Sequence, residues 1–353
     1  MAASLIRAER GAVAHIAEAM RQAGLTGRAF IVTDRNVYAH YGQPLAEILA
    51  KCEFEPSVHI LTPGEQTKSL RSLELLYDWL AESRAERTDI VVALGGGVVG
   101  DLAGYLAATY LRGMPLVQVP TTLLAMVDSS IGGKTGVNHP LGKNLIGAFH
   151  QASLVLIDPA LLAGLAPREY RSGLGEVVKY GVIMDAGLFE LIESRQADVL
   201  KQDEDIVDTI VKRCAELKVQ VVGEDEREAG LRMILNFGHT IGHAIEAATN
   251  YEALLHGEAI SIGMSGAAQI AVATGKFEGP SCERIKELLR CLGLPYAARG
   301  LAWEAVRNAM TLDKKTRAGR INWVLPTAIG TVEVTKDVPD EVVDAVLQKL
   351  LNA

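Results

Sequence analysis

The residues with the clearest chemical potential stand in one stretch of the chain, Leu231 to Thr249. Four polar side chains recur in it at offsets 0, 4, 7 and 11, namely Arg232, Asn236, His239 and His243. At about 100° per residue these offsets fall within roughly 60° of one another on a helix. A solvated face favours Lys and Glu and a buried face favours Leu and Ile. The stretch therefore predicts one helix that presents a guanidinium, an amide and two imidazoles to a site.

A zinc site needs three or four nitrogen, oxygen or sulfur ligands, with room left for a substrate oxygen. A lone histidine is more often a core or surface residue than a ligand, and the stretch above is not the HExxH motif of zinc peptidases. Besides His239, the chain offers His256, at the entry to an apolar helical stretch, and Glu176. Glu176 and Lys179 would share a helical face, so the pair taken by itself favours a surface salt bridge over a metal ligand. The residues alone leave both interpretations open.

A glycine-rich segment, Gly95 to Asp101, follows a predicted strand and precedes an Ala-rich helical stretch. Backbone N–H groups in such a loop, and the helix N-terminus after it, can bind a pyrophosphate. The segment satisfies GxGxxG, although a tight turn that needs positive φ explains its glycines too. Pro120 stands where a dinucleotide fingerprint places an acidic residue, so any dinucleotide would be held in a variant way. Asp34, after the first predicted strand, is then a candidate for the ribose hydroxyls, or a simple turn or cap residue.

A second cluster of small and hydroxyl residues follows the next strand, in Pro120 to Thr122, Asp128 to Lys134 and Gly142 to Asn144. Hydroxyls and glycines between two lysines are typical of a loop that lines a phosphate or polyol pocket. Either lysine alone, Lys134 or Lys143, would be explained as a solvated surface residue.

Short β-branched runs alternate with helical periodicity over the first 160 or so residues, which predicts a mostly parallel sheet with helices on both faces. The predicted strands are Ala29 to Thr33, Ser57 to Leu61, Asp89 to Leu94, Leu116 to Val119 and Leu154 to Ile157, and Ser69 to Ser83 is a predicted helix. From Pro167 onward helical periodicity dominates, in Asp205 to Val222, Leu231 to Thr249, Glu258 to Ala273 and Ser281 to Leu292. Residues 320–325 and 330–334 are expected to form a small hairpin. The pattern predicts a domain boundary near residue 165.

Composition narrows the possible function. The chain has 353 residues, 49% hydrophobic and 22% charged, which fits two globular domains. A net charge of −8 disfavours nucleic acid as a partner, although a local basic pocket for a small anion stays compatible with it. Residues 1–11 lack the apolar core of a signal peptide, and no apolar run reaches the roughly 18 residues of a membrane helix. Four irregularly spaced cysteines, at 52, 214, 282 and 291, suit neither a disulfide framework nor a zinc cage. We expect a cytoplasmic protein with no membrane partner.

Taken together, the motifs resemble the 3-dehydroquinate synthase family over nearly the whole chain. Their order and spacing carry the resemblance, and no position that we consider catalytic departs from the pattern. The matching stretches are Gly64 to Ser69, Gly95 to Asp101, Arg112-Gly113, Pro120 to Leu124, Asp128 to Thr135, Gly142 to Phe149, Gly175 to Tyr180, Asn236 to Ala247, His256 to Met264 and Asp313 to Lys315.

The resemblance implies a fold and a reaction. It implies an α/β NAD-binding domain at 1–165, with a variant Rossmann-like sheet, and an all-α metal- and substrate-binding domain at 166–353, with the active site in the cleft between them. The implied enzyme is a carbon–oxygen lyase of the shikimate pathway, which leads to the aromatic amino acids. It converts 3-deoxy-D-arabino-heptulosonate 7-phosphate into 3-dehydroquinate and phosphate through transient oxidation by NAD, phosphate elimination, re-reduction and aldol closure. A homodimer with NAD and Zn²⁺ or Co²⁺ is expected.

The resemblance also implies site residues. The metal ligands would be Glu176, His239 and His256. The NAD site would use Asp34, Asn36, Glu65, Lys68, Gly97, Val98, Val99, Gly100, Asp101, Thr121, Thr122, Lys134 and Lys143. The substrate pocket would use Arg112, Asp128, Lys134, Lys143, Asn144, Lys179, Lys218, Arg232, Asn236, His243 and Lys314, with Lys315 as an alternative to Lys314. His243 and Lys134 would serve in proton transfer and carbanion stabilisation.

Three other functions fit parts of this pattern. A sister sugar-phosphate cyclase would share the metal and NAD sites but differ in the residues that bind the substrate carboxylate. A metal-dependent polyol dehydrogenase would consume NAD stoichiometrically and would not need so many lysines. A non-catalytic NAD or sugar-phosphate sensor would gain nothing from a set of metal ligands with an open position.

Overall fold

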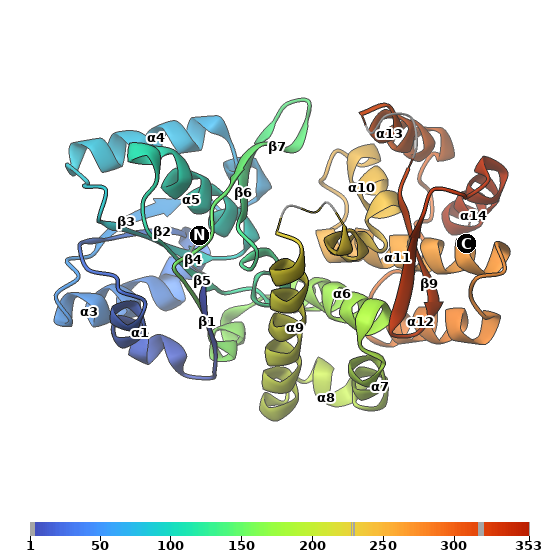
Figure 1. The fold of residues 1–353 in the computed structure, drawn as a ribbon, viewed down its shortest axis with the longest axis horizontal. Coiled ribbons are helices and arrows are strands. Elements are labelled where there is room, and N and C mark those ends of the chain that lie inside the picture. The colour runs from blue at the N-terminus through green and yellow to red at the C-terminus, as the bar shows by residue number, and fades with distance from the viewer. Residues whose placement is uncertain (1–3, 227, 229, 317–320, 353) are drawn as a thin grey trace. The chain divides into compact units, whose positions relative to one another are not determined.

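The structure is a computed structural model that describes residues 4–226, 228, 230–316 and 321–352, without the side chains of 311–316. The chain divides into two compact units, residues 1–166 and 167–353. The division falls at Pro167, where helical periodicity begins to dominate the sequence. In Figure 1 the first unit runs from blue to green and the second from light green to red.

The N-terminal unit contains a six-stranded parallel sheet in the order β1-β8-β5-β4-β2-β3. All five predicted strands form, each within one residue of its predicted ends. The strand that the sequence analysis missed is β1, an edge strand that includes Arg7 and is too short for a clear apolar run. The strands are β1 (Leu5–Ala8), β2 (Ala29–Asp34), β3 (Ser57–Leu61), β4 (Ile90–Gly95), β5 (Leu116–Pro120) and β8 (Leu154–Ile157).

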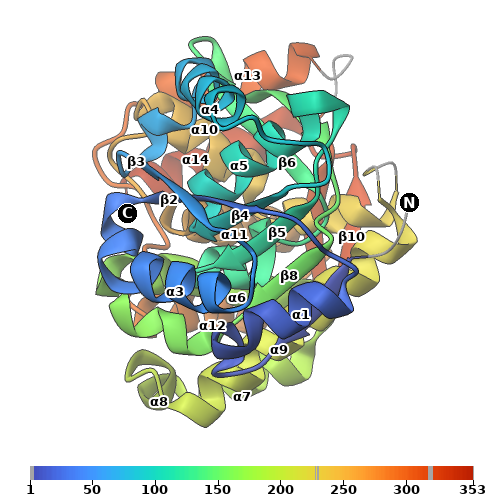
Figure 2. The same cartoon turned by 90° about the vertical axis from the view of Figure 1, so that its left-hand side faces the viewer.

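The strand order reverses direction between β2 and β4. From β2 the chain moves outward to β3, and from β4 it continues the other way through β5 to β8, a succession visible in Figure 2. In open parallel sheets, ligands bind at such a reversal, outside the carboxyl ends of the strands. Asp34 ends β2 and Gly95 ends β4. The topology therefore brings both predicted nucleotide-binding segments to the position where this fold binds ligands.

Helices cover both faces of this sheet (Figures 1 and 2). Helices α4 (Leu70–Glu82) and α5 (Gly97–Thr109) lie on one face, and α1 (Ile16–Gln22) and α3 (Gln43–Lys51) on the other. Helix α4 matches the predicted helix because Ser69 caps its first turn and Leu73, Leu76 and Leu80 form its buried stripe. The central strands β4, β5 and β8 are therefore fully buried, as a βαβ fold requires.

An antiparallel hairpin, β6 (Lys134–His139) and β7 (Gly142–Phe149), replaces the predicted loop around Lys134 and Lys143. Gly136 and Gly147 face each other across it, and a Cβ on either would meet the backbone oxygen of the opposite strand. These glycines permit the close pairing, yet in the sequence they interrupt the apolar alternation that signals a strand. The loop prediction was wrong for this reason.

The C-terminal unit is helical, with one two-stranded antiparallel ribbon, β9 (Trp323–Ala328) and β10 (Thr331–Thr335). Three predicted helical stretches form α9, α11 and α12, and the expected hairpin forms a few residues later than predicted. The helices are α6 (Pro167–Met184), α7 (Ala186–Ser194), α8 (Gln196–Leu200), α9 (Glu204–Glu224), α10 (His239–Ala248), α11 (His256–Ala273), α12 (Gly279–Cys291), α13 (Trp303–Thr316) and α14 (Asp340–Asn352).

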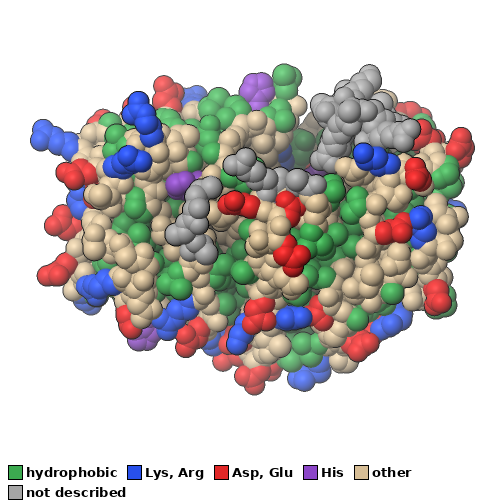
Figure 3. Space-filling view, in the orientation of Figure 1, with side chains coloured by type: hydrophobic (Ala, Val, Ile, Leu, Met, Phe, Trp, Pro, Cys, Tyr) green, Lys and Arg blue, Asp and Glu red, His purple; other side chains and the backbone are tan. Residues whose placement is uncertain are grey.

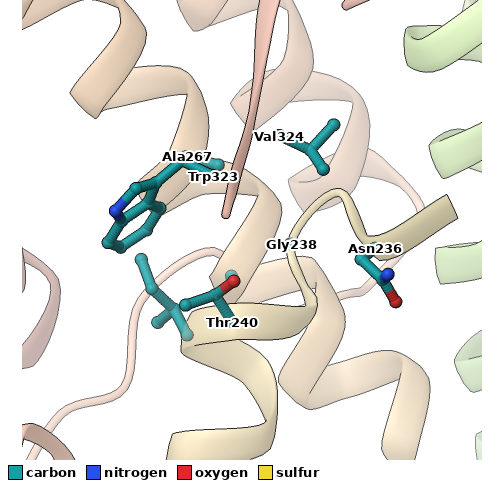
Figure 4. A pocket seen from close by; sticks show the side chains of 8 residues that line it. Asn236, Gly238, Thr240, Ala267, Trp323 and Val324 are labelled. Atoms are coloured by element: carbon teal, nitrogen blue, oxygen red, sulfur yellow. The ribbon is translucent and has the colours of Figure 1, made fainter. Parts of the chain in front are cut away.

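The predicted single helix at 231–249 was wrong. The chain forms a 3₁₀ helix at Leu231–Asn236, turns at Gly238 with φ +79°, and begins α10 at His239. A Cβ at Gly238 would lie 2.8 Å from the Ile260 oxygen and the Met264 nitrogen. The break therefore lets α10 start in backbone contact with α11. Figure 4 shows Asn236 on the segment before this turn and Thr240 on the helix after it.

Helices α6, α10 and α11 approach one another through glycines. A Cβ on Gly257 of α11 would overlap the Ser172 oxygen of α6, and a Cβ on Gly263 of α11 would overlap the Gly238 oxygen. The Gly257 nitrogen donates a hydrogen bond to Ser172 Oγ at 3.1 Å. These contacts hold the first residue of α10 and the first residue of α11 beside the middle of α6.

Within the described residues, no helix combines the length and the apolar character that a membrane span requires. On the face drawn in Figure 3, acidic and basic side chains are interspersed among apolar ones.

We expect Gly257→Ala or Gly263→Ala to lower the free energy of unfolding by about 1–3 kcal/mol, because the added methyl group forces packed backbones apart. Urea unfolding measures the change. Gly223→Ala is the control, since nothing lies within 4 Å of a Cβ at that helical position. It should be neutral or stabilising by up to about 1 kcal/mol. Equal effects at positions 223 and 257 would contradict the account of helix packing.

Candidate functional site

Three potential metal ligands meet in the C-terminal unit. Glu176 comes from the middle of α6, His239 begins α10 and His256 begins α11. One ligand atom from each lies within 4.8 Å of the others. The Nε2 atoms of His239 and His256 are each 3.7 Å from Glu176 Oε1. The structure thus brings together three residues that lie up to 80 positions apart in the sequence.

The orientation of the two imidazoles suits a metal. His239 directs Nδ1 to the Phe237 carbonyl oxygen at 3.1 Å, and His256 directs Nδ1 to Glu246 Oε1 at 3.4 Å. In the neutral imidazole, which is the form that binds a metal, a proton on Nδ1 satisfies each of these acceptors and leaves Nε2 with its lone pair toward Glu176. Two imidazole nitrogens and one carboxylate form a donor set that zinc and cobalt accept, with coordination positions left for substrate. The residues present therefore fit a divalent metal.

The charges around this cluster are buried. Lys179 Nζ forms an ion pair with Glu176 Oε2, and both side chains are almost fully enclosed. The pair that the sequence offered as a surface salt bridge is therefore an internal one. Burial and the Lys179 charge hold the pKa of His239 well below its usual range. Burial lowers the pKa of His256, but its contacts with Glu176 and Glu246 outweigh this and raise the pKa to about 9. The carboxylates of Glu176 and Glu246 therefore favour the positively charged form of the His256 ring, which lies between them.

His243 lies one turn along α10 from His239 and is more than half exposed. Its ring centroid is 5.2 Å from that of His239, and its Nε2 atom is 3.9 Å from Glu246 Oε2. It is therefore an imidazole that solvent and small molecules can reach beside a buried cluster. Together with Glu246 and His256 it forms a second grouping whose ligand atoms also lie within 4.8 Å.

The other predicted residues of this unit lie in its interior or beside the 3₁₀ helix. Arg232 and Lys218 are buried, and Arg232 Nη1 donates a hydrogen bond to the Glu226 oxygen at 2.5 Å. Asn236 Nδ2 donates to Glu228 Oε1 at 2.6 Å. A small hollow beside the Gly238 turn is lined by Asn236, Gly238, Thr240, Ile241, Gly263, Ala267, Trp323 and Val324 (Figure 4). Lys314 and Lys315 fall in α13, but their side chains lie outside the described part.

Sequence reasoning missed two carboxylates here, Glu228 and Glu246. Glu246 stands three residues after His243 and so on the same side of α10, which is a helical signal that the analysis did not use. Glu228 precedes the 3₁₀ helix and gave no local signal.

A second polar cluster lies in the N-terminal unit. Lys68 Nζ is 2.5 Å from both Asp101 Oδ2 and Asn144 Oδ1. Burial raises the pKa of Asp101 more than the charge of Lys68 lowers it. The cluster ties the N-terminal part of α5 to the β6–β7 hairpin.

The same hairpin is joined to the segment around Glu65. Glu65 Oε1 accepts a hydrogen bond from Asn138 Nδ2 at 2.7 Å and lies 3.9 Å from Lys143 Nζ. Asn138 also holds the Asn144 nitrogen through its Oδ1 atom, at 3.0 Å. Five predicted residues, Glu65, Lys68, Asp101, Lys143 and Asn144, therefore belong to one network, and Asn138 is the member that sequence reasoning missed.

The N-terminus of α5 combines close packing with buried hydroxyls. A Cβ on Gly97 would lie 3.1 Å from Ser129 Oγ, and one on Gly100 would lie 2.9 Å from Gln118 Oε1, so packing alone explains these glycines. Val99 is buried, and Thr122 Oγ1 accepts a hydrogen bond from the Ala125 nitrogen. In the described part of the chain, the hydroxyl oxygens of Thr33, Thr121 and Ser129 are buried without a hydrogen-bond partner. Orphaned hydroxyls beside a helix N-terminus suit a polar, anionic ligand.

Asp34 has the geometry of a cap residue. Its Oδ1 atom accepts hydrogen bonds from the nitrogens of Asn36 and Val37 at 2.8 and 3.1 Å, at the start of the short helix Arg35–Val37. This is the simple explanation that the sequence left open. Asp34 nevertheless ends β2 at the strand-order reversal, where a ribose would be bound in this fold.

Two predicted residues, Lys134 and Arg112, lie apart from the Lys68 network in the N-terminal unit, whereas the charge of Asp128 reaches Asp101 and raises its pKa. Lys134 pairs with Phe149 at the base of the hairpin, six residues along β7 from Lys143, so about 20 Å of strand separates the two lysines. Arg112 follows the C-terminal end of α5, about 20 Å along the helix from Gly97. Arg112 and Leu111 both have left-handed backbones, with φ +63° and +49°. Asp128 lies in the π-helix Ala125–Ser129.

Comparison with known proteins agrees with this architecture. Residues 58–172 match the family model for the 3-dehydroquinate synthase N-terminal part, and residues 173–316 match the model for the C-terminal part. The 3-dehydroquinate synthase of Nostoc punctiforme is 50% identical over 336 residues, which cover 94% of this chain and 93% of the relative. The enzyme of the same name from Gloeobacter violaceus is 46% identical over 343 residues, which cover 97% of this chain and 95% of the relative.

Solved structures show the same fold. The 2-epi-5-epi-valiolone synthase of Streptomyces hygroscopicus, with NAD⁺ and Zn²⁺ bound, has a TM-score of 0.92 at 32% identity and covers 99% of this chain and 97% of its own. A 2-deoxy-scyllo-inosose synthase complexed with carbaglucose-6-phosphate, NAD⁺ and Co²⁺ has a TM-score of 0.86 at 27% identity. The match covers 98% of this chain and 96% of the synthase chain. A sulfoacetaldehyde reductase from Bifidobacterium kashiwanohense, with a TM-score of 0.70 at 16% identity, shares the fold alone.

A parallel sheet with a strand-order reversal, followed by a helical unit, is the class of fold that this chain shares with the solved valiolone and inosose synthases. Within that class, the matches over most of the chain decide the family. The chain belongs to the 3-dehydroquinate synthase family.

We expect Glu176→Gln, His239→Ala and His256→Ala each to weaken Zn²⁺ binding by more than the roughly 10–100-fold typical of residues outside the coordination shell. Each change removes one of only three donors. Competition against a chromogenic chelator measures the affinity. The exposed His40 provides the control, and His40→Asn should leave the affinity unchanged. Full affinity in two of the three variants would show that the metal binds elsewhere.

Proposed function

We propose that this chain catalyses the 3-dehydroquinate synthase reaction, the conversion of 3-deoxy-D-arabino-heptulosonate 7-phosphate to 3-dehydroquinate and phosphate, with NAD and Zn²⁺ or Co²⁺. The observation that carries the proposal is the convergence of Glu176, His239 and His256 in a chain that matches this family over most of its length. The N-terminal unit would bind NAD, and the C-terminal unit would bind the metal and the substrate.

The bound groups supply the redox chemistry and the Lewis acidity: NAD accepts a hydride and gives it back, and the metal makes a substrate hydroxyl acidic. The protein holds them in place. Lys179 keeps Glu176 ionised by its charge, so that this carboxylate is an anionic donor. His243, exposed beside the cluster, is placed to move a proton at a substrate oxygen.

Buried cations would bind the acidic substrate and the cofactor. Lys179, Lys218 and Arg232 of the C-terminal unit are enclosed, so their charges act through little solvent and attract phosphate or carboxylate strongly. In the N-terminal unit, Lys68 and the orphaned hydroxyls of Thr33, Thr121 and Ser129 surround the start of α5, where the NAD pyrophosphate would lie. Asp34, Asn36, Glu65, Thr122 and the α5 residues 97–101 complete the proposed NAD site.

A sister sugar-phosphate cyclase is the second candidate, because solved cyclases with other products share the fold at TM-scores of 0.92 and 0.86. Their identities to this chain are 32% and 27%, whereas the relatives called 3-dehydroquinate synthase are 45–50% identical. The higher identity supports the first candidate.

With Zn²⁺ and catalytic NAD, the purified chain should release one phosphate per molecule of 3-deoxy-D-arabino-heptulosonate 7-phosphate, without accumulation of NADH. The hydride returns to the substrate in each cycle, so absorbance at the NADH band should stay flat while phosphate appears. His256→Ala should abolish release.

Two other outcomes would redirect the proposal. Release from a different sugar phosphate, with none from the heptulosonate, would favour the sister cyclase. Steady NADH formation from simple polyols would favour a dehydrogenase.

We also propose a cytoplasmic homodimer. All four cysteines are free thiols in the structure, which suits a reducing compartment. Leu141, Leu145 and Phe149 on the β6–β7 hairpin are exposed apolar side chains that association would cover.

Sedimentation equilibrium should give twice the chain mass of 37.8 kDa. Leu141→Asp/Leu145→Asp should shift the equilibrium toward the monomer, because charge at an apolar contact is costly to bury. Leu75→Asp, at an exposed leucine of α4, is the control. A wild-type monomer at micromolar concentration would overturn the dimer.

A further inference from the structure

The two histidines of the Glu176 cluster are oriented by different partners. His239 Nδ1 faces the Phe237 carbonyl oxygen, a neutral group two residues away in the same segment. His256 Nδ1 faces Glu246 Oε1, a carboxylate on another helix, at 3.4 Å. A backbone carbonyl is fixed by the fold, whereas the second contact depends on one side chain.

Glu246 is unusual for its place in the fold. It is a carboxylate that is only 3% exposed, on the otherwise apolar buried side of α10. Its two oxygens face two imidazoles: Oε1 lies 3.4 Å from His256 Nδ1, and Oε2 lies 3.9 Å from His243 Nε2. A buried acidic side chain is costly unless polar groups compensate it, so this position calls for a role.

The backbone of His256 is already fixed without Glu246. Gly257 packs directly against the Ser172 backbone, and Glu258 accepts a hydrogen bond from the Leu255 nitrogen at 2.8 Å. Glu258 also pairs with Arg168 of α6 at 2.7 Å. These contacts place the Cα atom of His256 but leave the ring free to flip about χ2, a torsion with two broad and nearly equivalent states. Only a partner on the ring itself can select one of them.

We propose that Glu246 is the positioning residue of the metal centre. Its carboxylate accepts the Nδ1–H of His256, which selects the ring orientation and tautomer that leave Nε2 directed toward Glu176. The negative charge also makes Nε2 a more basic donor, as carboxylates behind metal-bound histidines do. The inference rests on the metal site of the proposed function, but it concerns Glu246, which is not among the site residues that the family resemblance implies.

The geometry separates this role from that of a ligand. The second grouping of His243, Glu246 and His256 would require His256 to present Nδ1 to the metal and to turn Nε2 away from it. In the structure Nε2 faces the fully buried Glu176, and His243 is more than half exposed. Glu246 therefore lies behind His256, and Glu176 lies in front of it.

Glu246→Gln and Glu246→Leu test the proposal by Zn²⁺ affinity and by the visible absorption spectrum of the Co²⁺-substituted protein. Glutamine keeps an acceptor oxygen and loses the charge, and leucine loses both. We expect Zn²⁺ affinity to fall about 10-fold in the first and about 100-fold in the second. The Co²⁺ bands should remain but shift, because the same three donors bind in a looser geometry.

Glu193→Gln is the matched control, because Glu193 pairs with Arg284 in the same unit, outside the cluster. It should bind Zn²⁺ as the wild type does. Thermal unfolding of the metal-free proteins checks folding, and the nearly isosteric glutamine variant keeps the test valid if the leucine variant does not fold.

Two results would overturn the proposal. Unchanged affinity and spectrum in Glu246→Gln and Glu246→Leu would show that His256 needs no such partner. Complete loss of Co²⁺ binding in both Glu246→Gln and His243→Asn would make these residues ligands of the second grouping. Neither readout requires turnover, so failure of the proposed reaction would appear separately in the phosphate-release assay.

Discussion

The constraint on which the candidate site depends is the backbone contact among three helices of the C-terminal unit. Helices α6, α10 and α11 carry one proposed metal ligand each, and they meet where Gly257, Gly263 and Gly238 replace side chains by bare backbone. Helices with ordinary side chains at a crossing lie 8–10 Å apart. The closer approach is what lets Glu176, His239 and His256 offer atoms within 4.8 Å of one another.

Backbone contacts and side-chain contacts have different roles in this arrangement. Glycine contacts place the Cα atoms, whereas the Phe237 carbonyl and the Glu246 carboxylate orient the rings. The buried Glu176–Lys179 pair adds little net stability, because desolvation of two charges offsets their attraction. Its presence at the centre of the cluster is therefore better explained by the chemistry of the site than by folding.

Much of the fold was predictable, because it follows local rules. The central strands are uninterrupted apolar runs, and helix α4 has a cap and a regular stripe, so periodicity identified them. The prediction failed where a glycine serves a tertiary contact. Gly238 breaks an otherwise helical pattern because α11 lies against it, and Gly136 and Gly147 obscure a hairpin because they face each other.

The candidate site was predictable to a smaller extent. The helical stripe drew attention to His239 and His243, whose rings are neighbours in the structure, but on the assumption of one helix, and Asn236 lies on a different segment. The residues offered Glu176 and His256 only as separate candidates, and the family resemblance joined them to His239, since no local rule connects α6 to α11. Glu246 and Asn138 were missed because their importance lies in contacts between elements that only the folded chain creates.

An acidic chain can still hold acidic ligands, because the relevant potential is local. The net charge is −8, yet Lys68, Lys179, Lys218 and Arg232 are all buried in the two units. Surface charges are screened by salt within about 10 Å, whereas enclosed charges keep most of their field. Each buried cation must be compensated, and the structure supplies Asp101 for Lys68 and Glu176 for Lys179. An anionic cofactor or substrate would therefore enter a region where positive charge is already fixed, so binding would require little rearrangement of the protein.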